Sequence, residues 1–421
     1  MPTIGLYTAT ENELGAVGRA AERVEAELVV RSASDLDDGA DVDAFVDELT
    51  GEAGGDGSDG DGESEGGAEG GGEPVAAAVF WLHGAEESMP GYEHAVERLA
   101  EAGVPLVVES TGDAYAREDT TVPEADRQRV TEYLEKGGTA NVANCLDFLV
   151  DRYSAADRDY DDPVALPTEG LYHPDHPGAS DEEILASLSE ERPTVAIWFY
   201  ESHWTHENTR YVDAQVRAVE RQGADALPVF CNPATETGEE WDAERVTDEW
   251  LLGEASETPR DGGGETADRE PRVDAVLSSF MFSLSMDERG RAADGEGDAE
   301  EVFLDRLGVP VIQTVTTMRS RSRYDASDTG VMGFELALSV ALPEFDGNVI
   351  THPVSGKERT DDAADIGTAP KQHFPMDDRV DHAARLAVNW AELRHTPPEE
   401  KRVAVVLHNY PPSDDGIGTA F

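Results

Sequence analysis

The stretch that decides the fold is TVAIWFYESHWTHENTRYVDAQVRAVERQG, residues 194–223. Its first seven residues form an apolar run that is typical of a buried strand, and residues 208–222 have the amphipathic spacing of a helix. A second apolar run at 224–231 predicts another strand directly after that helix. A strand, a helix and a strand in this order predict a parallel pair of strands joined by a right-handed crossover.

The same alternation continues in both directions along the chain. Short apolar runs predict further strands at residues 3–8, 28–31, 75–83, 105–111, 275–282 and 309–315. Amphipathic or capped stretches predict helices at residues 11–27, 91–103, 123–136, 139–153 and 299–307. Short apolar strands that alternate with helices are typical of parallel sheets covered on both faces. We therefore expect an α/β protein with two doubly wound, flavodoxin-like domains.

Changes in composition along the chain predict the domain organisation. Residues 1–153 form the expected first domain, and its insertion at 51–74 contains 11 glycines and eight acidic residues with no apolar periodicity. Residues 154–193, rich in Asp and Pro, are interpreted as a crossover linker. Residues 194–375 form the expected second domain. Two further acidic insertions are expected within it, at residues 232–272 and 287–298.

Residues 376–421 predict the beginning of a third unit. A long amphipathic helix at 377–395 precedes Pro397-Pro398, and the run at 402–410 is apolar on both of its faces. Central parallel strands have this pattern, and they are normally followed by a covering helix. We therefore interpret 402–410 as the first strand of a truncated third domain.

The charge of the chain is strongly negative and limits its partners. Ninety acidic residues against 32 basic ones give a formal net charge of −58. Such a field repels nucleic acids and anionic membrane surfaces, which bind through clusters of Lys and Arg. Disorder is the alternative explanation of extreme acidity, but regular apolar segments persist along the chain. The composition is thus typical of a halophile protein that is stable in strong salt.

Several classes of protein are disfavoured by what the sequence lacks. No apolar run reaches the roughly 20 residues of a membrane helix, and no secretory signal is readable at the N-terminus, so we expect a cytoplasmic protein. Cys145 and Cys231 are too few for a disulfide framework. No P-loop is present, and no Gly-x-Gly-x-x-Gly turn follows the first strand. Any use of ATP is therefore expected of a partner.

The densest group of reactive side chains follows the strand at 194–200. Glu201, His203, His206 and Glu207 lie between that strand and the next helix, with Trp204 among them. Open α/β sheets bind ligands at the carboxyl ends of their strands. Carboxylates and imidazoles there can bind a divalent metal or accept protons, and an indole can stack on a planar ring. The alternative is a solvated loop that caps the helix.

A second candidate pair lies in the turn LPEFDG, residues 342–347. Glu344 and Asp346 are two residues apart and bounded by Pro343 and Gly347. Two carboxylates at this spacing suit metal or proton chemistry, and they suit the capping of a turn equally well.

Seven short motifs in a fixed order make the chain resemble a known family. They are GGTANVAN at 137–144, GLYHP at 170–174, FYESHW at 199–204 with Asn208-Thr209, LPVFC at 227–231, VPVIQ at 309–313, LPEFDG at 342–347 and NYPP at 409–412. Each motif alone is weak, but together they resemble the large subunit of cobaltochelatase, CobN, and of magnesium chelatase. The likeness covers residues 140–412 and corresponds to the N-terminal portion of those subunits.

The resemblance implies a subunit that binds a tetrapyrrole and takes part in an ATP-dependent insertion of Co²⁺ into a corrinoid precursor. It implies AAA+ partner subunits that use ATP and Mg²⁺, with the chain alone inactive as an enzyme. His203 and Glu201, with Glu344 and Asp346, are the expected catalytic groups. The metal is expected on His203 and His206, and the tetrapyrrole on Trp204, Asn208 and Tyr410. Magnesium chelation of a porphyrin and a non-catalytic tetrapyrrole- or partner-binding role are the alternatives.

Overall fold

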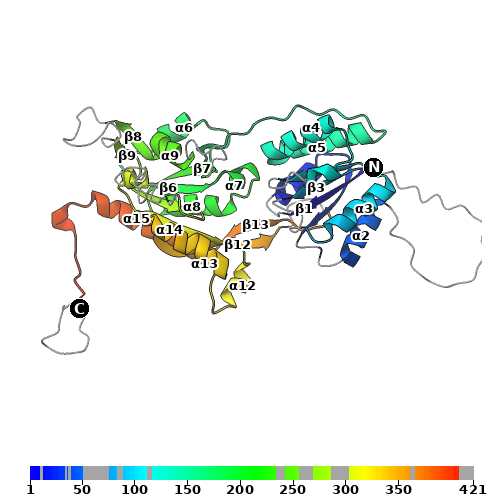
Figure 1. The fold of residues 1–421 in the computed structure, drawn as a ribbon. Helices are drawn as coiled ribbons and strands as arrows, with labels where there is room; N and C mark the ends of the chain where they lie inside the picture. The colour runs from blue at the N-terminus through cyan, green and yellow to red at the C-terminus, as the bar shows by residue number, and fades with distance from the viewer. Residues whose placement is uncertain are drawn as a thin grey trace, which may run out of the picture.

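The computed structural model describes residues 1–9, 13–33, 36, 39–50, 75–82, 89–110, 116–233, 242–255, 269–285, 303–360 and 366–406. The expected insertions at 51–74 and 287–298, and Tyr410, lie outside these residues. Figure 1 shows two α/β units side by side, each built around its own sheet. Within the described part of the chain, no helix is both long and apolar enough to cross a lipid bilayer.

The first unit contains a four-stranded parallel sheet in the order β2-β1-β3-β4. Its strands are β1 (Thr3–Thr8), β2 (Glu27–Ser32), β3 (Val75–Leu82) and β4 (Leu106–Ser110). One face packs against α1 (Leu14–Ala21), α4 (Glu124–Lys136) and α5 (Gly138–Tyr153), and the other against α2 (Gly39–Thr50) and α3 (Tyr92–Ala102). A 3₁₀ turn at Ala116–Asp119 precedes α4.

The second unit contains a seven-stranded sheet in the order β13-β12-β11-β10-β6-β7-β5. The five central strands are parallel, and the edge strands β5 and β13 run antiparallel to their neighbours. The strands are β5 (Glu169–Leu171), β6 (Thr194–Tyr200), β7 (Asp225–Cys231), β10 (Ala275–Ser278), β11 (Val311–Thr317), β12 (Val349–Arg359) and β13 (Lys371–Pro375).

Helices cover both faces of this second sheet. On one face lie α8 (Arg210–Arg221) and α15 (Asp377–His395), and on the other lie α6 (Asp181–Ala186), α9 (Asp242–Val246) and α11 (Phe303–Leu307). Short elements complete the unit: α7 (Glu201–Thr205), a π-turn at Thr247–Leu251, β8 (Leu252–Ala255) paired with β9 (Arg269–Pro271), α12 (Arg321–Asp325), α13 (Gly333–Leu336), a π-turn at Ala337–Ala341, α14 (Leu342–Phe345) and a 3₁₀ turn at Pro398–Glu400.

The structure confirms the α/β class and the parallel strands expected from the apolar runs. It also contains elements that the sequence analysis missed, namely α2, the β8–β9 pair inside the expected insertion 232–272, and the strands β12 and β13. The segment 154–193, interpreted as a linker, contributes β5 and α6 to the second unit. β12 contains Pro353 and Gly356, two residues that weaken any strand signal.

The helix of the expected third unit, α15, belongs to the second unit in the described part of the chain, and the rest of the third unit stays a prediction. Helix α15 packs on the second sheet through Val380, Val388 and a row of fully buried alanines. Residues 402–406 are not part of a strand, and the side chains of Val403 and Val406 are 84% and 92% exposed. The rest of the expected strand, 407–410, lies outside the described residues. The small alanine face of α15 explains its position, because alanines let the helix lie close to α8.

The two units are joined by direct contacts as well as by the chain. Figure 1 shows the β12–β13 pair reaching from the second sheet to the first unit. Between these strands, the Ile366 carbonyl accepts a hydrogen bond from the Val30 amide at 2.9 Å, and the Ile366 side chain is buried in the core of the first unit. On α1, Arg19 donates to the His206 carbonyl at 2.8 Å and pairs with Glu207 at 3.2 Å.

Candidate functional site

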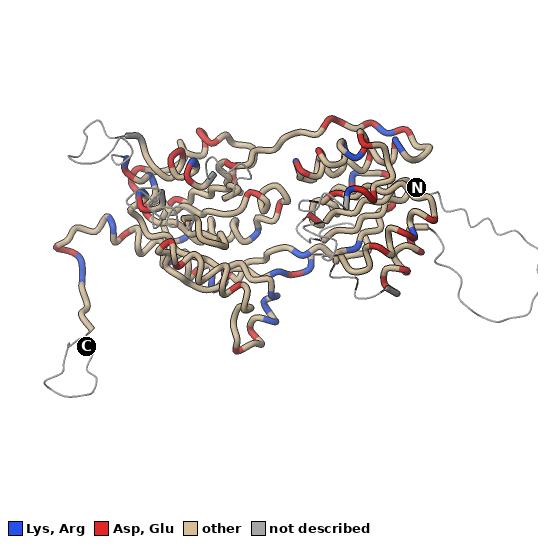
Figure 2. Tube along the Cα trace, viewed as in Figure 1, with Lys and Arg blue, Asp and Glu red and all other residues tan. Residues whose placement is uncertain are grey.

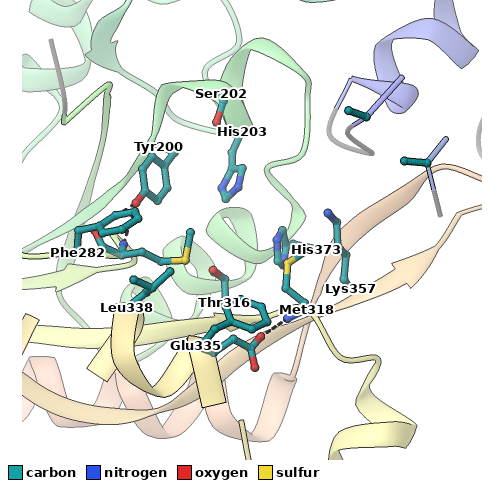
Figure 3. Close-up of a pocket in the computed structure, with 14 residues that line it drawn as sticks. Tyr200, Ser202, His203, Phe282, Thr316, Met318, Glu335, Leu338, Lys357 and His373 are labelled. Carbon is teal, nitrogen blue, oxygen red and sulfur yellow. Dashed lines mark hydrogen bonds between the residues drawn. The ribbon is translucent and has the colours of Figure 1, made fainter. Parts of the chain in front are cut away.

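A cavity of about 740 Å³ lies between the two units, at the carboxyl ends of their parallel strands. Ala9 and Ala33, which follow β1 and β2, line it from the first unit. From the second unit it is lined by Tyr200, Ser202, His203, Met281, Phe282, Thr316, Met318, Phe334, Glu335, Leu338, Lys357 and His373 (Figure 3). This is the place where open α/β sheets bind their ligands, and its volume is in the range of small-molecule sites.

His203 is held by a chain of hydrogen bonds that fixes its protonation. Its Nδ1 lies 2.8 Å from the Tyr211 hydroxyl, which lies 3.2 Å from the Ser279 hydroxyl. The Ser279 hydroxyl donates to the Trp198 carbonyl, which can only accept. Tyr211 must then donate to Ser279 and accept from His203. His203 therefore carries its proton on Nδ1, and its Nε2 holds a lone pair.

His373, on β13, lies beside His203 with 5.3 Å between the ring centres. Its Nδ1 is 3.2 Å from the Ser355 hydroxyl on the neighbouring strand β12. Its backbone amide donates to Asn208 Oδ1 at 2.8 Å. The loop after β6 thus fixes the position of the strand that carries His373.

Burial keeps both imidazoles neutral. Desolvation, with the nearby positive charge of Lys357, lowers the pKa of His203 to about 3. The pKa of His373 falls well below its ordinary value, mainly through desolvation and then through His203 and Lys357. A neutral imidazole of such low basicity is a poor proton acceptor but still has a lone pair for a metal.

The opposite side of the cavity is apolar and partly open. Phe282 and Phe334 are 51% and 52% exposed, and Met318 is 45% exposed. Phe282 has a φ of +68°, which is unfavourable for an aromatic residue, and its amide donates to the Leu338 carbonyl at 2.7 Å. Glu335 is buried and accepts from Thr317 and from the amides of Met318 and Met332, so it shapes this wall.

The other expected residues of the loop 201–208 take different positions. Glu201 accepts a short hydrogen bond from Thr205, and burial raises the pKa of Glu201. His206 is buried against Gly137 of the first unit, and its Nδ1 has no hydrogen-bond partner among the described residues. Trp204 stacks on Phe230 with 4.5 Å between ring centres. The structure therefore brings His203 into the cavity but not Glu201, Trp204 or His206.

The second expected pair lies away from the cavity. Glu344 is exposed on α14, whereas Asp346 is buried. The Asp346 carboxylate accepts from both hydroxyls and two amides of residues 283–285, at 2.5–3.2 Å. Asp346 thus fixes the loop that follows Phe282.

The cavity residues outside the loop 201–208 are not predicted from the sequence. His373 and Lys357 lie on two strands that it did not predict, and their pairing across β12 and β13 places them side by side. Lys357 is one of only four lysines in the chain. This rarity is the one feature of the sequence that singles it out. Among the described residues, no group of three or more His, Cys, Asp and Glu side chains is arranged to hold a metal ion.

Charge is distributed unevenly around the cavity. Figure 2 shows many acidic and fewer basic residues over the helices of both units, and a group of Lys and Arg residues with some acidic neighbours along β12 and β13 between them. Lys357, Arg359 and Lys371 belong to these two strands. The region beside the cavity is therefore less negative than the outer surface, which suits a ligand that carries carboxylates.

The sequence model of the family described as CobN/Magnesium Chelatase matches residues 131–421. The chain belongs to this family. It is 29% identical to the aerobic cobaltochelatase subunit CobN of Pseudomonas aeruginosa over 342 residues, which are 80% of this chain and 24% of that protein. It is 30% identical to CobN of Sinorhizobium sp over 308 residues, 71% of this chain and 22% of the relative.

The chloroplastic magnesium-chelatase subunit ChlH of Oryza sativa subsp. indica is 26% identical over 303 residues, 68% of this chain and 20% of that protein. The chain thus spans about a fifth to a quarter of the length of these relatives. Among solved structures, the catalytic subunit of cobaltochelatase from Mycobacterium tuberculosis matches with a TM-score of 0.64 and 23% identity, over 100% of this chain and 29% of that one. This match supports the fold of both units.

Proposed function

We propose that this chain is part of the tetrapyrrole-binding large subunit of an ATP-dependent cobaltochelatase, which inserts Co²⁺ into a corrinoid precursor. The observation that carries the proposal is the cavity between the two units. It combines two neutral imidazoles on one side with exposed aromatic and methionine side chains on the other. A flat, largely apolar ring with a metal-binding centre requires both kinds of surface.

The division of tasks follows from the chemistry. Apolar contact with Phe282 and Phe334 would hold the face of the ring, and the basic residues of β12 and β13 would attract its carboxylates. His203 would face the metal or the pyrrole N–H groups. ATP hydrolysis, with its Mg²⁺, is assigned to AAA+ partner subunits, because the sequence contains no P-loop. We place the assembly in the cytoplasm.

Cobalt is favoured over magnesium by two observations. The CobN relatives are 29–30% identical to this chain, slightly more than the magnesium-chelatase subunits, which are 25–28% identical to it. The cavity also presents imidazole nitrogen, which suits first-row transition metals, whereas Mg²⁺ prefers oxygen ligands. Magnesium insertion into a porphyrin is the second candidate because the family includes both activities by name.

The proposal is tested by titrating the purified chain in strong salt with a metal-free corrinoid and with protoporphyrin, following the absorption band of the ring. We expect saturable binding of the corrinoid, weakened about tenfold by Phe282→Ala or Phe334→Ala, as the loss of an aromatic contact predicts. Phe345→Ala is the matched control, since Phe345 is 63% exposed and lies outside the cavity lining. Equal binding by all three variants would contradict the proposed site.

A further inference from the structure

The cavity contains two imidazoles that share a geometry suited to one ion. A metal bound about 2.0–2.1 Å from each Nε2 lies about 3.2 Å from each ring centre, so two rings on one tetrahedral ion stand about 5.2 Å apart. His203 and His373 are 5.3 Å apart. Their Nδ1 atoms are already engaged with Tyr211 and Ser355, which leaves Nε2 of each ring for a ligand.

We propose that His203 and His373 together form a two-imidazole site that receives the divalent transition metal before it enters the ring. The site pairs His203 with His373, a residue 170 positions away, in place of the expected partner His206. The inference rests on the proposed function only for the source of the metal, since binding of the metal alone needs no tetrapyrrole.

The surroundings of His203 are those of a metal ligand. Metal-binding histidines commonly donate their second ring N–H to a fixed partner, which orients the ring and sets the tautomer. The hydrogen-bond chain through Tyr211 and Ser279 to the Trp198 carbonyl does this for His203.

Lys357 makes the site suitable for a metal in transit. It is the partner of His373 in the pairing of β12 with β13, and it lines the same cavity as both rings. A positive charge beside a cation site weakens binding by Coulomb repulsion. Two protein ligands and a neighbouring ammonium give a weakly held ion with open coordination positions, which a tetrapyrrole can take over. A resident structural metal would need more protein ligands.

Two other histidine pairs in the structure supply the controls. The rings of His173 and His176 are 4.9 Å apart, and those of His352 and His382 are 5.1 Å apart. His176 and His382 are the exposed members. A His176→Gln/His382→Gln background therefore breaks both pairs and keeps the cavity lining, so that His203 and His373 are the one pair of adjacent imidazoles left among the described residues.

The experiment titrates this background protein with Co²⁺ in strong salt, without tetrapyrrole, and records the paramagnetically shifted imidazole N–H protons by NMR. We expect two shifted N–H signals from bound Co²⁺, and a loss of affinity of at least about tenfold in His203→Gln or His373→Gln. Lys357→Met is expected to tighten Co²⁺ binding. A large excess of Mg²⁺ is expected to leave the signals in place.

Three results would overturn the site: unchanged affinity in His203→Gln and His373→Gln, no tightening in Lys357→Met, or displacement of Co²⁺ by an equal concentration of Mg²⁺. Circular dichroism in the same buffer checks that each variant is folded, and Lys357→Met decides the outcome if a histidine variant does not fold. If the chain bound Co²⁺ as expected but did not bind the corrinoid, the proposed function would be rejected and the two-imidazole site would stand.

Discussion

Single residues of one turn take very different roles in this protein. Glu344 and Asp346 are two positions apart, and sequence alone gives no reason to separate them. In the structure Glu344 is exposed, whereas Asp346 is buried under four hydrogen bonds from residues 283–285. These bonds hold the loop next to Phe282 in its unusual backbone conformation, so that Asp346 supports the cavity from behind.

We expect Asp346→Ala to lower the free energy of unfolding by about 2–4 kcal/mol, because two serine hydroxyls and two amides lose a charged acceptor in a buried place. Glu344→Ala is the matched control and is expected to change the free energy of unfolding by no more than about 0.5 kcal/mol. Denaturant unfolding in strong salt measures both. Equal effects of the two substitutions would show that the hydrogen bonds to Asp346 do not stabilise the loop.

At the scale of elements, strands with continuous apolar runs could be predicted and mixed strands could not. β1 and β6 are apolar and buried along most of their length, and the sequence placed both correctly. β12 mixes apolar and polar residues without a regular alternation and contains Pro353, so its pairing with β11 and β13 comes from tertiary contacts. Helix α2 was missed although Val42 and Phe45 begin a readable helical spacing.

The residues of the candidate site also differ in whether the sequence predicts them. His203 could be found because it follows a strongly patterned strand at a place where α/β proteins bind ligands. His373 could not, since only the antiparallel pairing of β13 with β12 brings it to the cavity. Residues that meet through an unpatterned edge strand leave no local signal in one sequence.

Helix α15 gives a prediction about packing. Its buried face contains Ala383, Ala384, Ala387 and Ala391, all fully buried against the second sheet and α8. We expect Ala387→Leu to lower the free energy of unfolding by about 1–3 kcal/mol, because the larger side chain overfills a close helix contact.

Asn389→Leu is the control for α15, since Asn389 is exposed on the same helix and the introduced residue is the same. Thermal unfolding followed by circular dichroism compares the two. If the Ala387→Leu and Asn389→Leu variants had the same unfolding temperature, α15 would not pack as closely against α8 as the structure has it.

At the scale of the whole molecule, the main feature is the formal net charge of −58. Acidic residues cover the helices of both units, and in dilute salt they repel one another across the surface (Figure 2). Several ion pairs between Arg and the acidic residues, such as Arg98 with Asp43 and Asp47, relieve only part of this repulsion.

We expect the unfolding temperature to rise as KCl increases from about 0.1 M to about 3 M, because the Debye length falls from about 10 Å to below about 3 Å. A neutral osmolyte at the same osmotic strength is the control, since it stabilises by exclusion without screening charge. If KCl and the osmolyte raised the unfolding temperature equally, charge screening would be rejected as the cause. An unfolding temperature that does not depend on KCl would reject the halophile interpretation.

Ile366 sits in the core of the first unit although it belongs, by chain order, to the hairpin of the second. A side chain of the second unit therefore completes the hydrophobic core of the first unit. Residues 1–153 expressed alone would lack the Ile366 side chain and would expose apolar surface beside Val30. The two units are therefore best expressed together or combined in trans.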